Sequence, residues 1–313
     1  MRRFIQKRMS QQNYLSFMIN VFLNCYSSWD KDVNFVDSIE CINASISDFY
    51  ENFKINFYTC DINVNRLTSN PIFKSDPWLL FVRYNTHKEF FECDYKVKSD
   101  DILKRFVSLN FSTDTNHRHK QNLLKFITDS DIDCYFSNIS ENITLTEIPE
   151  CFPNGYYKDR FDYGVPKEYF LGLIDIVSEG SMDMSTHFSE KSYKAIFYKK
   201  PFISLAGPYW YETFKKHGFE LYDEIFDYGF DTNENKIERL EDILLQIKTL
   251  NSCEYSDLSE KVESIKPKVE HNYNRLFSLE SKILNDAYFD EDKKVNNLFL
   301  NEEYTNKKRN DFI

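Results

Sequence analysis

The chain has 313 residues, a formal net charge of -11 and a sequence pI of about 5.2. Hydrophobic residues make up 42% of it and aromatic residues 17%, which is enough apolar material for the cores of two modest domains. The acidic balance opposes a general nucleic-acid-binding role, because neutralising a phosphate backbone requires clustered lysines and arginines.

The cysteines and the start of the chain both predict a reducing, cytoplasmic setting. The seven cysteines are odd in number and include no C-x-x-C pair, which favours buried thiols over a disulfide framework. The basic segment 1–8 is followed by polar residues instead of an apolar signal-peptide core, and no run of about 18 apolar residues occurs. We therefore expect a cytoplasmic protein without a membrane span.

In chain order, the first hundred residues predict a small α/β unit. A strand is expected at 17–24 and a helix at 37–53, where apolar residues recur with helical spacing. Two further strands are expected at 55–60 and 77–83. We assign this N-terminal domain to residues 1–99.

A second α/β unit is predicted to follow. Strands at 106–110 and 134–137 flank a helix at 121–127, and the apolar run 169–178 predicts a buried strand. That strand ends in the polar tract 179–187, which is where a ligand would lie, since parallel sheets bind ligands at the carboxyl ends of their strands.

Residues 188–231 complete this second unit and predict strand, turn, helix, strand, helix and strand in succession. This alternation is typical of a parallel α/β sheet. The whole unit is assigned to residues 100–232 as a Rossmann-like domain. Residues 233–313 predict C-terminal helices that end in a charged tail.

The helix within this window begins with three polar residues, Ser189, Glu190 and Lys191. Its apolar positions fall on one face, at Tyr193, Ile196 and Phe197. The polar side chains therefore emerge at the N-terminal end, where a serine cap, a carboxylate and an ammonium are suited to bind a sugar-phosphate.

The order of these features resembles the donor-binding domain of GT-B nucleotide-sugar glycosyltransferases. The shared pattern is Ser-Glu-Lys, a short helix, Lys-Pro-Phe, a hydrophobic strand, a Gly-Pro turn, an amphipathic helix, Gly-Phe and an acidic segment. It is most similar to a group of phage and bacterial glycosyltransferases, and more distantly to the α-1,3-fucosyltransferases. A second block agrees: 104–110 followed by 116–120 resembles that group's strand, short loop and His-Arg pair at a helix start.

The resemblance implies a set of donor-binding residues. It places His117 and Arg118 against the donor diphosphate, Glu190 on the ribose hydroxyls, and a lysine on the phosphates. The lysine is Lys191 or Lys194. Arg118 is alternatively a solvated surface arginine, and Glu190 alternatively a first-turn carboxylate that favours the helix dipole. Because both blocks lie at strand-to-helix junctions, we expect them to converge on one cleft.

Two aspartates and one pair of histidines are further candidate site residues. Asp227 and Asp231 match the family's acidic segment, although aspartates are also common in turns. His117 and His119 lack nearby cysteines or carboxylates that would complete a metal site.

The sequence Asp131-Ile-Asp133 matches the Asp-x-Asp metal motif of GT-A enzymes, but it precedes a strand instead of following one. Gly-rich phosphate loops are also absent from the sequence. We expect neither a metal nor a cofactor, since the nucleotide-sugar is a substrate.

Together these features predict an α/β fold with two Rossmann-like units facing a cleft, followed by C-terminal helices. The predicted activity is metal-independent glycosyl transfer to an unidentified glycan, protein or DNA acceptor. The carboxylates after the first strand, Asp30, Asp32 and Asp37, are candidate bases for deprotonating the acceptor hydroxyl. Two alternatives stay open. One is a phage glycosyltransferase that modifies DNA bases, working in the host cytoplasm, and the other is a non-catalytic interaction protein that keeps the fold.

Overall fold

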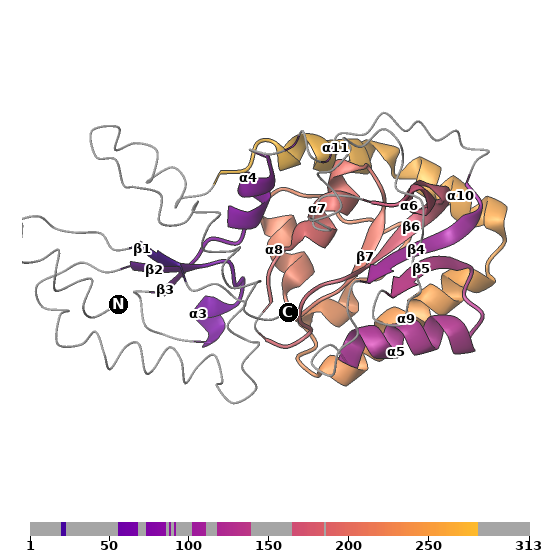
Figure 1. The fold of residues 1–313 in the computed structure, drawn as a ribbon, viewed down its shortest axis with the longest axis horizontal. Coiled ribbons are helices and arrows are strands. Elements are labelled where there is room, and N and C mark those ends of the chain that lie inside the picture. The colour runs from indigo at the N-terminus through magenta and orange to yellow at the C-terminus, as the bar shows by residue number, and fades with distance from the viewer. Residues whose placement is uncertain are drawn as a thin grey trace, which may run out of the picture.

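The protein is a mixed α/β structure with two parallel sheets (Figure 1). The computed structural model describes residues 20–22, 56–67, 73–85, 88, 91, 102–110, 118–138, 165–184 and 186–280. The smaller sheet belongs to the N-terminal part of the chain, and the larger sheet with its helices belongs to the rest.

The smaller sheet has three parallel strands in the order β1 (Asn20–Phe22), β2 (Asn56–Thr59) and β3 (Phe73–Ser75). The predicted strands at 17–24 and 55–60 are thereby confirmed, with shorter bounds. The predicted helix at 37–53 lies outside the described residues.

The strand predicted at 77–83 is wrong. After β3 the chain forms a helix, α4 (Leu79–Asn85), and a shorter helix, α3 (Val64–Leu67), follows β2. A short apolar run is compatible with either a buried strand or a buried helix. Here the backbone N–H groups of Leu79 and Val82 donate to the carbonyls of Asp76 and Trp78, and the Asp-Pro pair before them is a helix-start signal.

The larger sheet has four parallel strands in the order β5-β4-β6-β7. These strands are β4 (Lys104–Asn110), β5 (Cys134–Asn138), β6 (Gly172–Ser178) and β7 (Phe202–Leu205). Every residue of β6 and β7 is buried, which explains why both segments are apolar runs without alternation. This part of the chain is compatible with the Rossmann-like fold that its sequence predicts.

The strand predicted at 169–178 is correct only from Gly172 onward. Its first residues belong instead to a short helix, α6 (Lys167–Leu171). Gly172 lies at the junction of α6 and β6, and a Cβ added to it would lie 2.8 Å from the Cβ of Val107. A larger residue at this position would therefore force β6 away from β4.

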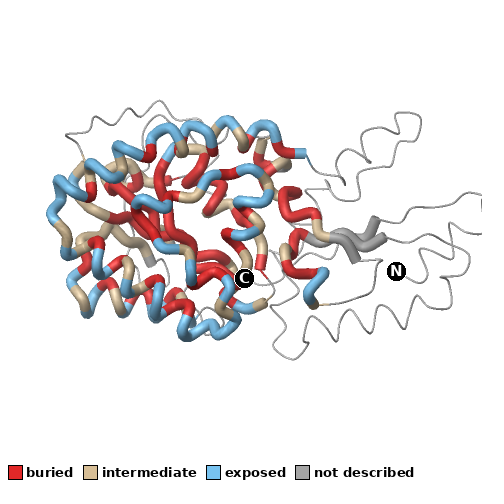
Figure 2. Tube along the Cα trace, turned by 180° about the vertical axis from the view of Figure 1, so that it is seen from behind, coloured by how far each residue is buried: buried red, intermediate tan, exposed pale blue. Residues whose placement is uncertain are grey.

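Helices cover both faces of the larger sheet (Figure 1). On one face lie α5 (Arg118–Asp129) and α9 (Lys236–Ser252), and α9 packs on both α5 and β7. On the other face α7 (Glu190–Phe197) packs on β6 and β7, and α11 (Lys266–Leu276) packs on α7. Figure 2 shows that the buried residues concentrate in the sheet between these two layers.

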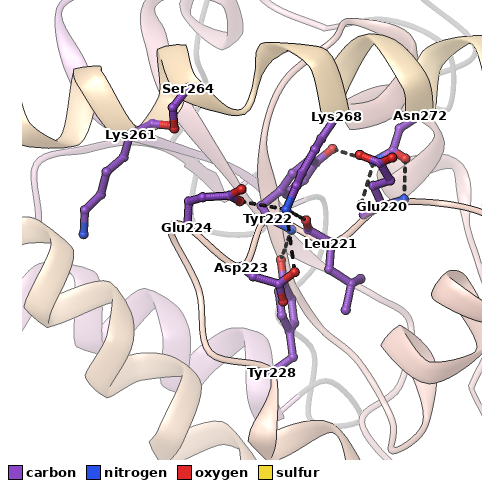
Figure 3. Close-up of polar contacts among 10 residues, drawn as sticks. All are labelled: Glu220, Leu221, Tyr222, Asp223, Glu224, Tyr228, Lys261, Ser264, Lys268 and Asn272. Atoms are coloured by element: carbon purple, nitrogen blue, oxygen red, sulfur yellow. Dashed lines mark hydrogen bonds and ion pairs between the residues drawn. The ribbon is translucent and has the colours of Figure 1, made fainter.

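Neither the first nor the final strand predicted within 188–231 forms. Residues 188 and 189 lead directly into α7. The window contributes α7, β7 and α8 (Trp210–Lys216), after which residues 219–228 run without regular structure to a 3₁₀ turn, Gly229–Thr232. The backbone N–H and carbonyl of Glu220 are both bonded by the Asn272 side chain from α11, at 2.7 and 2.8 Å (Figure 3). A side chain thus replaces the neighbouring strand as the hydrogen-bonding partner.

A second contact holds the same segment to α11. The Nζ of Lys268 lies 2.8 Å from a carboxylate oxygen of Glu224 and donates to the carbonyl of Leu221 at 2.9 Å (Figure 3).

Between α9 and α11 the chain forms α10 (Tyr255–Ser264). The C-terminal helices therefore pack on the same core as the sheet, and buried residues of α9, α10 and α11 belong to it.

Three of the seven cysteines lie in the described part of the chain, and all three are free thiols. Cys60 is buried, whereas Cys134 and Cys253 are half-buried. None of the helices described here has the length and apolarity needed to cross a membrane.

Candidate functional site

The order in which the chain adds strands to the larger sheet reverses at β4, whose two neighbours are β5 and β6. The chain runs from β4 outward to β5 on one side, then returns to place β6 on the other side of β4. The helices that follow these two strands, α5 and α7, lie on opposite faces of the sheet (Figure 1). In open parallel sheets this reversal leaves a crevice at the carboxyl ends of the two strands, where ligands bind.

Glu179 links the N-termini of α5 and α7 at this position. It is the first residue after β6 and is fully buried. Its backbone carbonyl lies 3.0 Å from Nε2 of His119 in the first turn of α5, and a carbonyl can only accept, so this nitrogen donates. The hydroxyl of Ser189 donates to the Glu179 carboxylate, and the Ser189 N–H lies 3.5 Å from its other oxygen.

Ser189 also forms the N-cap of α7. Its backbone is extended, with φ of -113°, and its Oγ accepts a hydrogen bond of 3.2 Å from the N–H of Lys191. This is the arrangement that satisfies a free N–H at the start of a helix. One hydroxyl therefore serves two purposes, because it accepts from α7 and donates to Glu179.

Glu190 and Lys191 form an ion pair in the first turn of α7. The Lys191 Nζ lies 2.7 Å from Glu190 Oε1, and the two side chains are 23% and 14% exposed respectively. Burial alone would raise the pKa of Glu190, but the positive charges of Lys191 and Lys194 outweigh it and lower that pKa to about 2. Glu190 is consequently a fixed carboxylate near the candidate site.

The other sequence-predicted residues are placed differently. Lys194 is buried within α7, one turn beyond Glu190, and Arg118 is the exposed first residue of α5. The two sequence blocks thus meet at Glu179, and the contact from α5 comes from His119 instead of Arg118. His117 lies outside the described residues, as do the candidate bases Asp30, Asp32 and Asp37.

Glu179 itself was not singled out by the sequence, although the polar tract that it opens was. The available signal is its position as the first charged residue after the buried strand end Ile176-Val177-Ser178. Its role depends on Ser189 and on α5, which are distant along the chain, and no local pattern encodes that contact.

Comparison of the chain with protein-family models, with curated proteins and with solved structures found no match. The interpretation of this site therefore depends on its geometry and on the motifs in the sequence.

Both aspartates of the acidic segment have structural partners. The Asp231 carboxylate accepts from the backbone N–H groups of Tyr211 and Glu212, at 3.0 and 2.8 Å, and so caps α8. Burial raises the pKa of Asp231 to about 6 despite these bonds. Asp227 accepts from the N–H of Gly229 at 2.9 Å, which is a turn contact.

The Asp131-Ile-Asp133 segment lies at the amino end of β5, at the opposite edge of the sheet from Glu179. Asp133 is paired with Lys104 at 2.7 Å and accepts from the N–H of Arg105 at 3.1 Å. Within the described ranges, no three His, Cys, Asp or Glu side chains come together in a way that would hold a metal ion.

The smaller sheet adjoins the larger sheet at the edge where Glu179 lies, formed by the carboxyl ends of β6 and β7. The N–H of Ile62, which follows β2, donates to the carbonyl of Thr186 at 3.0 Å. The Arg66 guanidinium lies 3.5 Å from the ring centroid of Tyr209, at the start of α8. The segment after β2 therefore contacts the segments after β6 and β7, so the carboxyl ends of strands from both sheets adjoin one region.

Proposed function

We propose that the protein is a glycosyltransferase whose nucleotide-sugar donor binds where the N-termini of α5 and α7 meet. The proposal is supported by Glu179, which bonds His119 at the start of α5 and Ser189 at the start of α7. Glu179 lies where the strand order of the parallel sheet reverses. Helix N-termini carry a partial positive charge, which favours a diphosphate. The resemblance of both sequence blocks to GT-B donor domains points to the same ligand class.

Glu190 supplies the contact to the nucleoside in this proposal. Its pKa of about 2 keeps it ionised at neutral pH, and an ionised carboxylate can accept hydrogen bonds from two ribose hydroxyls at once. Because Lys191 is paired with Glu190, much of its charge is already balanced. The diphosphate is then neutralised mainly by the helix N-termini and Arg118, with Lys191 as a shared partner.

The arrangement of the two sheets supports a GT-B type of organisation. In this proposal the smaller sheet forms the acceptor side, since residues after β2 adjoin the segments after β6 and β7. The reaction is glycosyl transfer, in which the bond from the anomeric carbon to the diphosphate breaks and a new bond to the acceptor oxygen forms. The acceptor proton passes to a base from the smaller unit, for which Asp30, Asp32 and Asp37 stay hypotheses.

Thermal unfolding with added nucleotides tests this function. We expect UDP, GDP or a corresponding nucleotide-sugar to raise the melting temperature, because a ligand at about 100 times its dissociation constant adds about 2.7 kcal/mol to the free energy of unfolding. The stabilisation should persist in EDTA, since cationic side chains and helix N-termini neutralise the diphosphate. A requirement for Mn²⁺ would contradict metal independence, and no shift with any nucleotide would favour an interaction protein.

A further inference from the structure

The segments that follow β6 and β7 are held together by buried side chains from two other parts of the chain. These segments are residues 180–184 with 186–187, called the β6 loop here, and residues 206–209, called the β7 loop. They touch directly as well: the N–H of Gly207 lies 3.2 Å from the Thr186 hydroxyl. A Cβ added to Gly207 would lie 2.2 Å from the carbonyl oxygen of Asp183, so the two loops admit no larger side chain between them.

Arg239 of α9 bonds both loops from one side. Its guanidinium donates to the carbonyl of Ala206 at 3.1 Å, and also to the carbonyls of Met182 and Asn233. The residue is 1% exposed. Burial lowers the pKa of the guanidinium, although nearby carboxylates oppose this. Burying a charged arginine side chain costs free energy. The planar guanidinium, with N–H groups pointing in several directions, can bond three carbonyls at once.

Asn63 bonds the same two loops from the smaller unit. Its amide nitrogen donates to the carbonyl of Met184 and to the carbonyl of Pro208, each at 2.9 Å, and the residue is 1% exposed. Only a side chain with two N–H groups at one nitrogen can make both bonds. Its own backbone N–H is held by Asp61 at 2.8 Å, which fixes the start of α3 against the β6 loop.

We propose that Arg239 and Asn63 are positioning residues of the donor site, and that they set the spacing between the β6 and β7 loops. This inference rests on the proposed function. The β6 loop connects Glu179 to Ser189, so its path determines where the start of α7 meets the start of α5. Asn63 brings the smaller unit into the same arrangement, and the geometry of the donor site thereby depends on the acceptor side.

The chain offers a matched control for each residue. Asn272 is equally buried and bonds a backbone N–H and a carbonyl of Glu220, on the segment 219–228 (Figure 3). Arg275 donates to the carbonyl of His217 at 2.8 Å, at the C-terminal end of α8. In the described contacts neither control residue bonds the β6 or β7 loop. Asn272 holds one backbone N–H and one carbonyl, and Arg275, which is half-buried, holds one carbonyl.

The experiment compares Asn63→Asp and Arg239→Lys with Asn272→Asp and Arg275→Lys in the full chain. Asparagine and aspartate have the same shape, but aspartate replaces the amide N–H donors by an acceptor oxygen. Lysine keeps the positive charge of arginine but lacks the several N–H groups of the planar guanidinium. Titration with UDP, GDP, ADP and CDP is combined with hydrogen–deuterium exchange. We expect the first two variants to exchange faster at 182–187 and 206–209, and to bind the preferred nucleotide at least about tenfold more weakly. The controls should keep the affinity of the wild type within about twofold.

Two results would overturn the proposal. Unchanged exchange of both loops in Asn63→Asp and Arg239→Lys would show that these residues do not hold them. Faster exchange with unchanged nucleotide affinity, or an equal loss of affinity in the controls, would show that the clamp is structural only. If the wild type itself bound none of the four nucleotides, the proposed function would fail, and the exchange data would still decide whether the loops are held.

Discussion

At the scale of single residues, the charge of Glu190 is set by its neighbours. Burial favours the neutral acid, whereas Lys191 at 2.7 Å and Lys194 favour the carboxylate and prevail. Because the folded-state pKa of about 2 lies below the ordinary value of 4.5, Glu190 stabilises the fold above that ordinary value. This contribution is lost as the pH falls toward about 2.

Glu190→Ala separates ligand binding from folding. The substitution removes the partner of Lys191, so we expect a loss of about 1–3 kcal/mol in the free energy of unfolding at neutral pH. Nucleotide affinity should fall by roughly ten- to over a hundred-fold, because a hydrogen bond to a charged group contributes about 1.5–3 kcal/mol. Calorimetric titration with the nucleotide that most stabilises the wild type measures the second effect, and urea unfolding measures the first.

The matched control for this substitution is Asp257→Ala. Asp257 is an exposed carboxylate in the first turn of α10, so it shares the helix-dipole position of Glu190 without adjoining Glu179 or Ser189. It should leave nucleotide affinity unchanged. Equal affinities for wild type and Glu190→Ala would reduce Glu190 to a charge that stabilises the end of a helix.

At the scale of elements, the buried strand β6 carries an ionisable group in its centre. The Asp175 carboxylate accepts from the Tyr169 hydroxyl at 2.8 Å, and both residues are buried. Burial raises the pKa of Asp175 to about 7, although Tyr169, Lys200 and Lys194 oppose the shift. Burial likewise lowers the pKa of Lys200 to about 8, and its ammonium donates to the carbonyl of Gly172.

Asp175 makes the stability of the sheet depend on pH. The pKa of Asp175 is higher in the folded protein than in the unfolded chain, so with rising pH the unfolded chain loses the Asp175 proton first. The free energy of unfolding therefore declines as the pH rises from about 4 to about 7. Asp175→Asn keeps an acceptor for Tyr169 and removes this titration. We expect the wild type to lose up to about 1.4 kcal/mol per pH unit relative to the variant across this window.

Urea unfolding of both proteins at a series of pH values measures the difference. The difference between the two proteins reports Asp175 together with its effect on its neighbours, because its charge also raises the pKa values of Lys200 and of the Cys134 thiol. Parallel stability curves for the two proteins would contradict the raised pKa.

At the scale of the whole molecule, aromatic packing joins the small unit to the large one. Trp78, at the start of α4, stacks on Phe188 with ring centroids 4.2 Å apart and an interplanar angle of 16°. Its ring also lies 5.1 Å from that of Phe219, and the side chain is 3% exposed. Trp78 and Phe81 therefore belong to the same buried core as the large sheet.

Trp78→Ala tests whether this packing stabilises the molecule as one body. Truncating a buried tryptophan removes apolar contact and leaves a cavity, so we expect a loss of about 3–5 kcal/mol in the free energy of unfolding. Trp78→Phe keeps an aromatic ring against Phe188 and should cost clearly less. Chemical unfolding monitored by circular dichroism gives both values, and a loss below about 1 kcal/mol in Trp78→Ala would show that the two units unfold independently.

Local sequence patterns predicted much of the larger unit. The β6 and β7 segments are largely apolar runs bounded by polar residues, and α7 has its cap, its apolar face and its first-turn charges within nine residues, 189–197. These signals are local, because strand burial and helix capping depend on neighbours along the chain. The parallel class of the sheet followed from the alternation of strands and helices.

The tertiary structure decided what depends on distant partners. The apolar run before Arg83 suits a strand or a helix, and it forms α4, which packs on α7. Residues 219–228 stay irregular, and Asn272 bonds the backbone groups of Glu220. The link from α5 through Glu179 to Ser189, and the bonds of Arg239 and Asn63 to the two loops, join residues far apart in sequence. Sequence periodicity reports which face of an element is buried, whereas these contacts depend on which element comes to lie beside it.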